Sequence, residues 1–133
     1  MANTYEATTR GVRVRVTPPY LPAQSEPEQG QYIWAYTVGI ENHGPETVRL
    51  VSRHWVITDA MNRVEEVRGP GVVGEQPTLA PGESFQYTSG CPLPTPSGAM
   101  RGAYQMVTAT GEGFDAEIPE FSLHLPEATR RMN

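Results

Sequence analysis

The chain contains 133 residues and carries a formal net charge of −5. This length suits a single domain, and the negative charge argues against general binding to nucleic acid or to an anionic membrane. The only cysteine, Cys91, excludes an intrachain disulfide and fits a reducing compartment.

Glycine and proline number 13 each, and turn residues at this density favour short strands over helices. Residues 11–17 alternate valine with polar residues, which predicts a half-buried strand with Val12, Val14 and Val16 facing the core. Residues 31–42 form the strongest predicted strand and place large aromatic side chains on one face. Further strands are predicted at residues 47–58, 63–68, 84–89, 100–110 and 114–125, the last interrupted at Pro119.

The remaining segments are predicted to be turns and loops. Residues 91–98 contain three prolines and are expected to run extended over the surface. Residues 69–77 form a loop rich in glycine, and residues 126–133 are expected to form a flexible tail.

About seven strands with turn signals every 8–12 residues are typical of an all-β, immunoglobulin- or fibronectin type III-like two-sheet β-sandwich. We expect one such domain over residues 1–133. Its predicted core comprises apolar and aromatic residues at period-2 positions: Tyr32, Trp34, Tyr36, Val38, Trp55, Ile57, Phe85, Tyr104, Met106 and Phe121. Tyr104 is predicted to act as the tyrosine corner of such sandwiches, in preference to contacting a ligand.

Six sequence segments, which follow one another in the same order, resemble the ApaG domain family. They are residues 53–59 (RHWVITD), 67–77 (VRGPGVVGEQP), 79–83 (LAPGE), 87–90 (YTSG), 100–106 (MRGAYQM) and 118–123 (IPEFSL). The chain is most similar to stand-alone bacterial members, and it departs from the family pattern in an insert around residues 23–29.

The resemblance implies a fibronectin type III-like sandwich without an established catalytic activity. It also implies an association with magnesium and cobalt tolerance, as in bacterial members of the family. In eukaryotes the domain is fused to an F-box protein and to a polymerase-interacting protein, so the resemblance further implies protein binding.

Gly69, Gly71 and Gly74 match the spacing G-x-G-x-x-G, which binds a dinucleotide only where a helix follows. Two prolines and a glycine within residues 77–82 exclude that helix. Two interpretations stay open: a sharp connection between sheets, or a nest of backbone N–H groups that binds a small anion beside Arg68.

Residues that commonly ligate metals or act as nucleophiles do not show the corresponding spacings. The three histidines lie far apart in the sequence, and Cys91 lacks the local signature of a thiol nucleophile. A spatial cluster of His54, Asp59, Glu65 and Cys91 is conceivable from the sequence. The prediction is nevertheless that the protein needs neither metal nor cofactor.

These observations predict a non-enzymatic module that binds a protein partner through loops at the ends of the sandwich. The predicted binding residues are Arg68, Gly69, Gly71, Val72, Val73, Gly74 and Glu75. Val72 and Val73 are expected to supply exposed apolar contacts, and the alternative is that both plug one end of the sandwich.

The second functional hypothesis is a sensor that binds a small anion, a phosphorylated metabolite or a divalent metal at residues 69–74. Residues 1–20 contain no secretory signal, and the chain has no apolar run approaching the ~20 residues of a membrane span. The sequence therefore predicts a cytoplasmic protein without a membrane or nucleic-acid partner.

Overall fold

The structure is a computed structural model that describes residues 4–18, 20–21 and 24–125. Nine strands and one short 3-10 helix are named in this part of the chain: β1 (Tyr5–Thr9), β2 (Val12–Thr17), η2 (Pro27–Gln29), β3 (Tyr32–Asn42), β4 (Val48–Asp59), β5 (Val64–Pro70), β6 (Thr78–Leu79), β7 (Ser84–Leu93), β8 (Ser97–Thr108) and β9 (Gly113–His124). The tail predicted at residues 126–133 lies outside the described residues. Within those limits, none of the helical segments has the length and apolar character that crossing a membrane requires.

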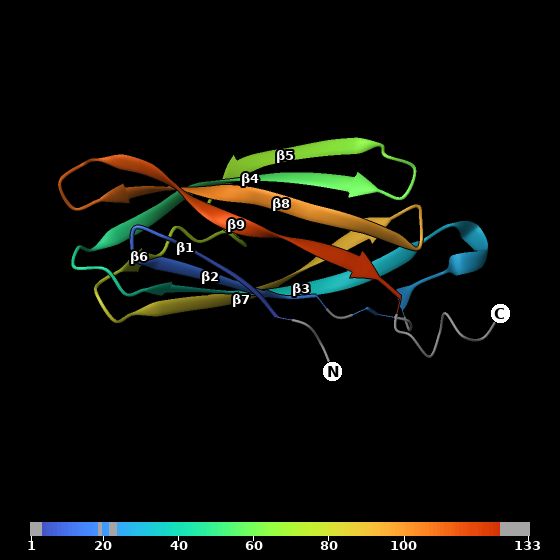
Figure 1. Cartoon of the computed structure of the whole chain (residues 1–133), viewed down its shortest axis with the longest axis horizontal. Helices are drawn as coiled ribbons and strands as arrows, with labels where there is room; N and C mark the ends of the chain where they lie inside the picture. The colour runs from blue at the N-terminus through green and yellow to red at the C-terminus, as the bar shows by residue number, and fades with distance from the viewer. Residues whose placement is uncertain (1–3, 19, 22–23, 126–133) are drawn as a thin grey trace.

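The strands form two antiparallel sheets that pack face to face (Figure 1). One sheet has the order β1-β2-β3-β7, and the other has the order β5-β4-β8-β9 with the short β6 paired to β4. This arrangement confirms the predicted immunoglobulin- or fibronectin type III-like sandwich. All seven predicted strands are present, with ends that differ by a few residues.

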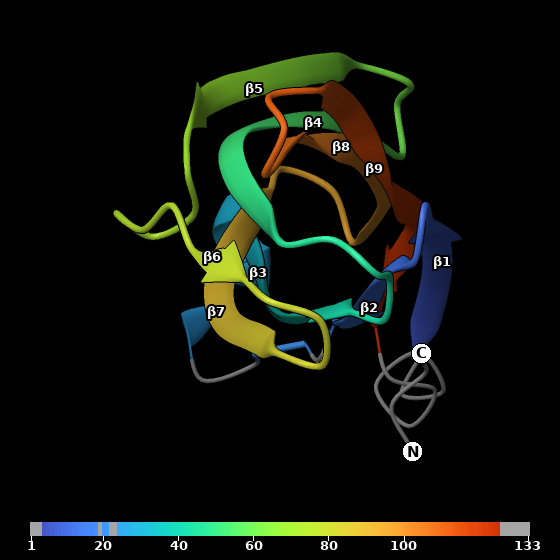
Figure 2. The same ribbon diagram turned by 90° about the vertical axis from the view of Figure 1, so that its left-hand side faces the viewer.

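The two long sides of the sandwich differ. On one side β1 packs against β9, and the Glu117 N–H donates to the Thr9 hydroxyl at 3.0 Å, which ties the sheets together. On the other side the edge strands are β5 and β7, which are not paired with each other. Figure 2 looks along the sandwich and shows β5 at the top and β7 at the bottom, with the segment that leads from β5 to β6 running down between them; we call this the open side.

The core between the sheets is built around interlocking aromatic rings. Trp55 of β4 packs edge-on against Tyr36 of β3, with ring centroids 5.2 Å apart, and against Tyr104 and Phe121 at 6.3 and 6.0 Å. Such edge-to-face pairs add to the stabilisation from buried area. Seven of the predicted core residues are buried, and the other three, Tyr32, Ile57 and Phe85, are partly buried and pack against the core.

Tyr104 is completely buried, as a structural role requires, but its hydrogen bond differs from the prediction. The Tyr104 hydroxyl pairs with the Tyr87 hydroxyl of the opposite sheet at 2.5 Å. A tyrosine corner instead bonds to nearby backbone. Tyr104 therefore links the two sheets through a buried side-chain hydrogen bond.

Two bulges shift the alternation of inward and outward side chains within a strand. Opposite β8, the register slips between Leu50 and Ser52, so Val51 is the extra residue of β4. In β9 the slip falls at residues 119–120, which agrees with the predicted interruption at Pro119. Because of this second bulge, Ile118 and Phe121 both face the core although they are three residues apart.

Two segments differ from the prediction. β1 was not predicted, and it pairs with β2 through a tight turn at Arg10 and Gly11, both with positive φ. Residues 91–98 were predicted to lie on the surface, whereas β7 continues to Leu93 and the chain then crosses to the other sheet. Over residues 91–96, the three exposed prolines alternate with the buried Cys91, Leu93 and Thr95.

We predict that Trp34→Ala lowers the free energy of unfolding by about 3–5 kcal/mol, the usual effect of truncating a buried aromatic side chain. Trp34 is fully buried, and its indole N–H donates to the His124 carbonyl at 3.1 Å. Urea denaturation followed by circular dichroism measures the change. A loss below about 1 kcal/mol would show that the Trp34 pocket is not packed as described.

A surface cluster on β2 and β3 predicts a dependence of stability on pH. Hydrogen bonds from His43 and Arg13 lower the pKa of Glu41 from 4.5 to about 2. Since the folded-state pKa is depressed, the stabilisation is present above pH 4.5 and is lost as pH falls towards 2. We expect Glu41→Gln to lower the free energy of unfolding by about 1 kcal/mol at pH 7 and to leave it almost unchanged at pH 2. The value at pH 7 takes into account that solvent screens these surface charges. A deficit that stays constant over this range in denaturation experiments would contradict the assignment.

Candidate functional site

The predicted binding residues occupy the end of β5 and the turn that follows it. Arg68 and Gly69 belong to β5, as predicted for Arg68, whereas Gly69 was expected to begin the loop. The turn at residues 71–76 projects from the body between β5 and β6 (Figure 2). β6 follows the glycine motif in place of the helix that a dinucleotide site would need.

The turn is a two-residue hairpin closed by reciprocal hydrogen bonds. Val72 and Glu75 exchange both N–H···O=C bonds at 2.8 Å, and the two residues between them, Val73 and Gly74, have φ of 42° and 82°. Positive φ at both positions is the pattern of a type I′ turn, which favours Asn or Gly at the first position. A β-branched valine with positive φ is a backbone outlier and stores strain there.

The two valines lie in different environments, which corrects the expectation that both behave alike. Val72 is 1% exposed and belongs to the core cluster, so it plugs the end of the sandwich. Val73 is 57% exposed at the tip of the turn. Only Val73 therefore supplies the expected apolar surface.

Three backbone N–H groups of this turn are occupied by hydrogen bonds within the protein. The N–H of Gly71 donates to the Val51 carbonyl at 2.9 Å, and those of Val72 and Glu75 close the hairpin. Gly71 has φ of 58°, and a side chain there would collide with the Glu75 carbonyl. These bonds remove three N–H groups from any anion-binding nest at the turn.

Arg53 of β4 connects the turn to the interior of the sandwich. Its Nη1 donates to the carbonyls of Pro70 and Gly71 at 3.0 and 2.9 Å. The guanidinium also lies beneath Gly69, where an added Cβ would come within 3.0 Å of it. The φ angle of Gly69 is not in the left-handed region, so backbone conformation does not account for glycine at this position. Its close packing against the guanidinium does.

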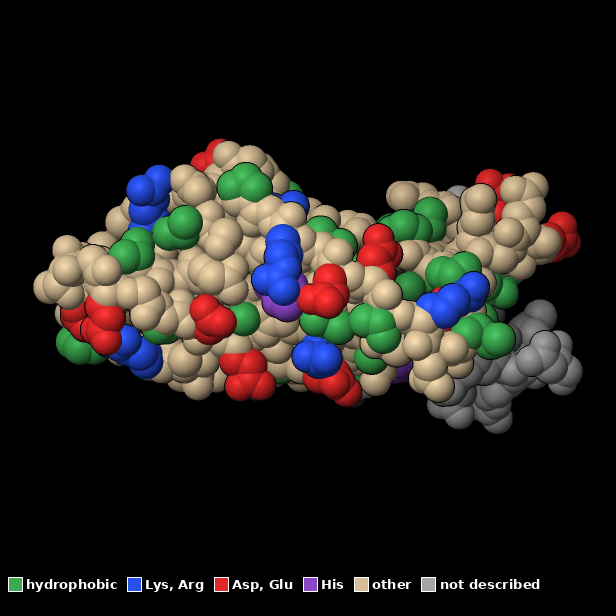
Figure 3. Space-filling model, turned by 90° about the horizontal axis from the view of Figure 1, so that it is seen from above, with side chains coloured by type: hydrophobic (Ala, Val, Ile, Leu, Met, Phe, Trp, Pro, Cys, Tyr) green, Lys and Arg blue, Asp and Glu red, His purple; other side chains and the backbone are tan. Residues whose placement is uncertain are grey.

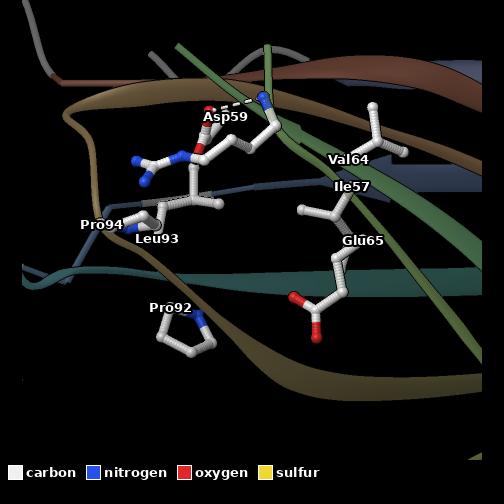
Figure 4. A pocket seen from close by; sticks show the side chains of 8 residues that line it. Ile57, Asp59, Val64, Glu65, Pro92, Leu93 and Pro94 are labelled. Atoms are coloured by element: carbon white, nitrogen blue, oxygen red, sulfur yellow. Dashed lines mark hydrogen bonds and ion pairs between the residues drawn. The ribbon is translucent and has the colours of Figure 1, made fainter. Parts of the chain in front are cut away.

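A cleft of about 290 Å³ lies on the open side of the sandwich, between β5 and β7. Tyr36, Arg53 and Trp55 line it together with Ser89 and Cys91 of β7. A second hollow of about 220 Å³ continues the cleft towards the β4–β5 turn. The two share Ile57, Glu65 and Pro92, and Figure 4 shows the Glu65 side chain extending from β5 into the gap between the sheets.

Burial controls the chemistry of the groups that line the cleft. Burial raises the pKa of the Cys91 thiol to about 12, and the nearby Glu65 carboxylate adds to this shift. Cys91 is therefore a neutral thiol at physiological pH and a poor nucleophile. Burial likewise raises the pKa of Tyr36, so its phenol stays protonated as a hydrogen-bond donor.

Of the residues of the conceivable metal cluster, Glu65 lies near Cys91 in the cleft and lines the second hollow with Asp59, whereas His54 points away from them. His54 lies on the outer face of the sheet, where it bonds to Glu66 at 2.8 Å, and Asp59 is paired with Arg63 at 2.8 Å. Across the described ranges, no group of three or more His, Cys, Asp or Glu side chains is placed to hold a metal ion.

The free edge of β5 is the second exposed feature of the site. The Gly71 N–H donates to Val51, and the Asp59 N–H donates to the Arg63 carbonyl. In an antiparallel ladder these two bonds direct residues 65, 67 and 69 towards β4. The backbone groups of Val64, Glu66 and Arg68 consequently face outward.

Exposed hydrophobic side chains gather near this edge. Val64 begins β5 and is 61% exposed, Met61 in the preceding turn is 69% exposed, and Val73 lies in the following turn. Glu66 and Arg68 project between them on the outer face and lie 3.4 Å apart. Figure 3, seen from the β5 side, shows basic, acidic and histidine side chains near the middle and hydrophobic side chains towards both ends.

Comparison with known proteins gives consistent similarities. The family model of the ApaG domain matches residues 22–108. The chain is 65% identical to Protein ApaG of Caulobacter vibrioides, covering 97% of this chain and 92% of that protein, and 61% identical to Protein ApaG of Rhodospirillum centenum, covering 97% and 99%.

Solved structures show the same fold. A crystal structure of an ApaA protein from Bordetella pertussis is similar with a TM-score of 0.86 and 58% identity, covering 87% of this chain and 94% of that one. The C-terminal domain of wzt is similar with a TM-score of 0.55 at 10% identity, covering 94% and 79%, and this likeness concerns the fold alone.

The opposite environments of the two valines predict opposite effects on stability. Val72→Ser should lower the free energy of unfolding by about 1.5–3 kcal/mol, because it removes a buried apolar side chain. Val73→Asn should raise it by about 1 kcal/mol, because asparagine tolerates positive φ and little contact is lost. Urea denaturation of the two single variants tests both. A destabilising Val73→Asn would mean that the valine makes contacts that outweigh its backbone strain.

Proposed function

Because the chain belongs to the ApaG domain family, we propose that it is a binding module without catalytic activity that receives an extended segment of a protein partner at the free edge of β5. The observation that carries this proposal is the outward-facing backbone of Val64, Glu66 and Arg68 beside the exposed Met61 and Val73. An unpaired strand edge is a template for adding a strand from another chain.

Several features of β5 favour strand addition over a merely solvated edge. The only proline of the strand is Pro70, at its end, where the missing N–H would have faced outward and costs no bond to β4. The turn at residues 71–76 stands beside this end of the edge and presents Val73. The predicted binding residues Arg68, Val73 and Glu75 then border the partner, while Gly69, Gly71, Val72 and Gly74 shape the surface.

The groups within the site fit binding better than catalysis. The Cys91 thiol is held neutral by burial, and His54 is hydrogen-bonded to Glu66, which lowers the pKa of that carboxyl. Specificity in this mode comes from side chains on either side of the added strand, and affinity comes from main-chain hydrogen bonds. Glu66 and Arg68 would supply charges of both signs on the outer face.

The proposal predicts that Glu66→Pro abolishes partner capture and that Glu66→Ala preserves it. Both variants lose the carboxylate, but only proline removes the outward N–H at the centre of the edge. Purified wild type, Glu66→Pro and Glu66→Ala serve as baits for proteins of the source cell, which are quantified by mass spectrometry.

Proteins retained by wild type and Glu66→Ala but lost with Glu66→Pro support strand addition. The circular dichroism and thermal midpoint of each bait establish that it is folded. Equal capture by folded Glu66→Pro and wild type would show that the β5 edge is not the contact.

A further inference from the structure

We propose that the cleft between β5 and β7 is a binding site for a small carboxylate with an apolar stem, whose carboxylate pairs with the Arg53 guanidinium. The site lies inside the open side of the sandwich and is separate from the β5 edge. The inference therefore does not depend on a protein partner.

Arg53 has a positive charge that no described side chain neutralises. The ion pairs of the described arginines involve Arg10, Arg13, Arg15, Arg63 and Arg68. The hydrogen bonds of Arg53 leave from Nη1 and end on two backbone carbonyls. A guanidinium has five N–H donors, so Nε and Nη2 are left for the bidentate pairing with a carboxylate that arginine favours.

A second donor in the cleft wall lacks a partner. Trp55 is 2% exposed, and its indole Nε1 is buried without a hydrogen-bond acceptor among the described residues. A buried donor without a partner costs free energy and calls for an explanation by an unseen ligand or water. Tyr36 and Ser89 also line the cleft, and their hydroxyls can donate as well as accept hydrogen bonds.

The size and walls of the cleft favour a monocarboxylate over phosphate. A volume of about 290 Å³ is at the lower end of the range for ligand pockets. Ile57, Val67 and Met100 make much of the wall apolar, and a single arginine would leave a phosphate dianion poorly compensated there.

Glu65 lies at the opposite end of the cleft from Arg53, and its charge bears on which carboxylates can bind. It pairs with Ile57 in the β4–β5 ladder, four residues along β4 from Arg53. At the rise of a strand this is roughly 13 Å, so Glu65 lies away from the bound carboxylate and repels a second one. The cleft should accordingly select a monocarboxylate over a dicarboxylate of similar length.

The two tryptophans allow a direct test by NMR. Their indole N–H groups give two separate signals in a proton–nitrogen correlation spectrum, and Trp34, which bonds to the His124 carbonyl, serves as the internal reference. Hexanoate is titrated into the labelled protein, and hexanol, hexylamine and adipate are titrated in parallel as matched controls. We expect saturable shifts of the Trp55 indole signal with hexanoate and an unmoved Trp34 signal.

Substitution of the arginine completes the experiment. Arg53→Met should weaken hexanoate binding by at least about tenfold, since it removes the charge and keeps the aliphatic stem. Adipate, hexanol and hexylamine should bind at least about tenfold more weakly than hexanoate to wild type. An unshifted Trp55 signal with hexanoate, or equal shifts with hexanol, would overturn the proposal even if Arg53→Met did not fold.

Discussion

The hydrogen bonds from Arg53 to the carbonyls of Pro70 and Gly71 attach the end of β5 to a charged side chain that lines the cleft between the sheets. They hold the end of β5 over the guanidinium, and Gly69 leaves room for this close contact. The turn that follows directs its Gly71 N–H to the Val51 carbonyl and is closed by the reciprocal bonds of Val72 and Glu75. One arginine thus links the cleft, the strand edge and the turn, which would otherwise be three unrelated surface features.

This arrangement is the reason for proposing a binding surface on one long side of the sandwich. Contacts of β1 with β9 join the two sheets on the opposite side. β5 is bonded only to β4, and its place at the sheet edge leaves the backbone of Glu66 and Arg68 available. An edge strand that is bonded on one side only has few stabilising contacts. Segments that bind partners are often of this less stable kind.

The sequence predicted the strands and most of the core because period-2 alternation is a direct consequence of strand geometry. It did not single out Arg53, because the two halves of this strand disagree: alternation counted from Val48 and Leu50 places residue 53 outside, whereas alternation counted from Trp55 and Ile57 places it inside. The bulge at Val51 reverses that phase, and neither a glycine nor a proline in the sequence announces it. The bulge in β9 was partly foreseeable because Pro119 marks it. The different environments of Val72 and Val73 depend on the hairpin between Val72 and Glu75, a tertiary detail that composition does not contain.

Residue-resolved hydrogen exchange along β5 tests the central claim most directly, because it reads the direction of each backbone N–H. In the free protein, the amides of Val67 and Gly69 should be protected, whereas those of Glu66 and Arg68 exchange freely. When a captured partner is added, Glu66 and Arg68 should become protected as well. Protection of Glu66 and Arg68 already in the free protein, or their continued rapid exchange in the complex, would contradict the account.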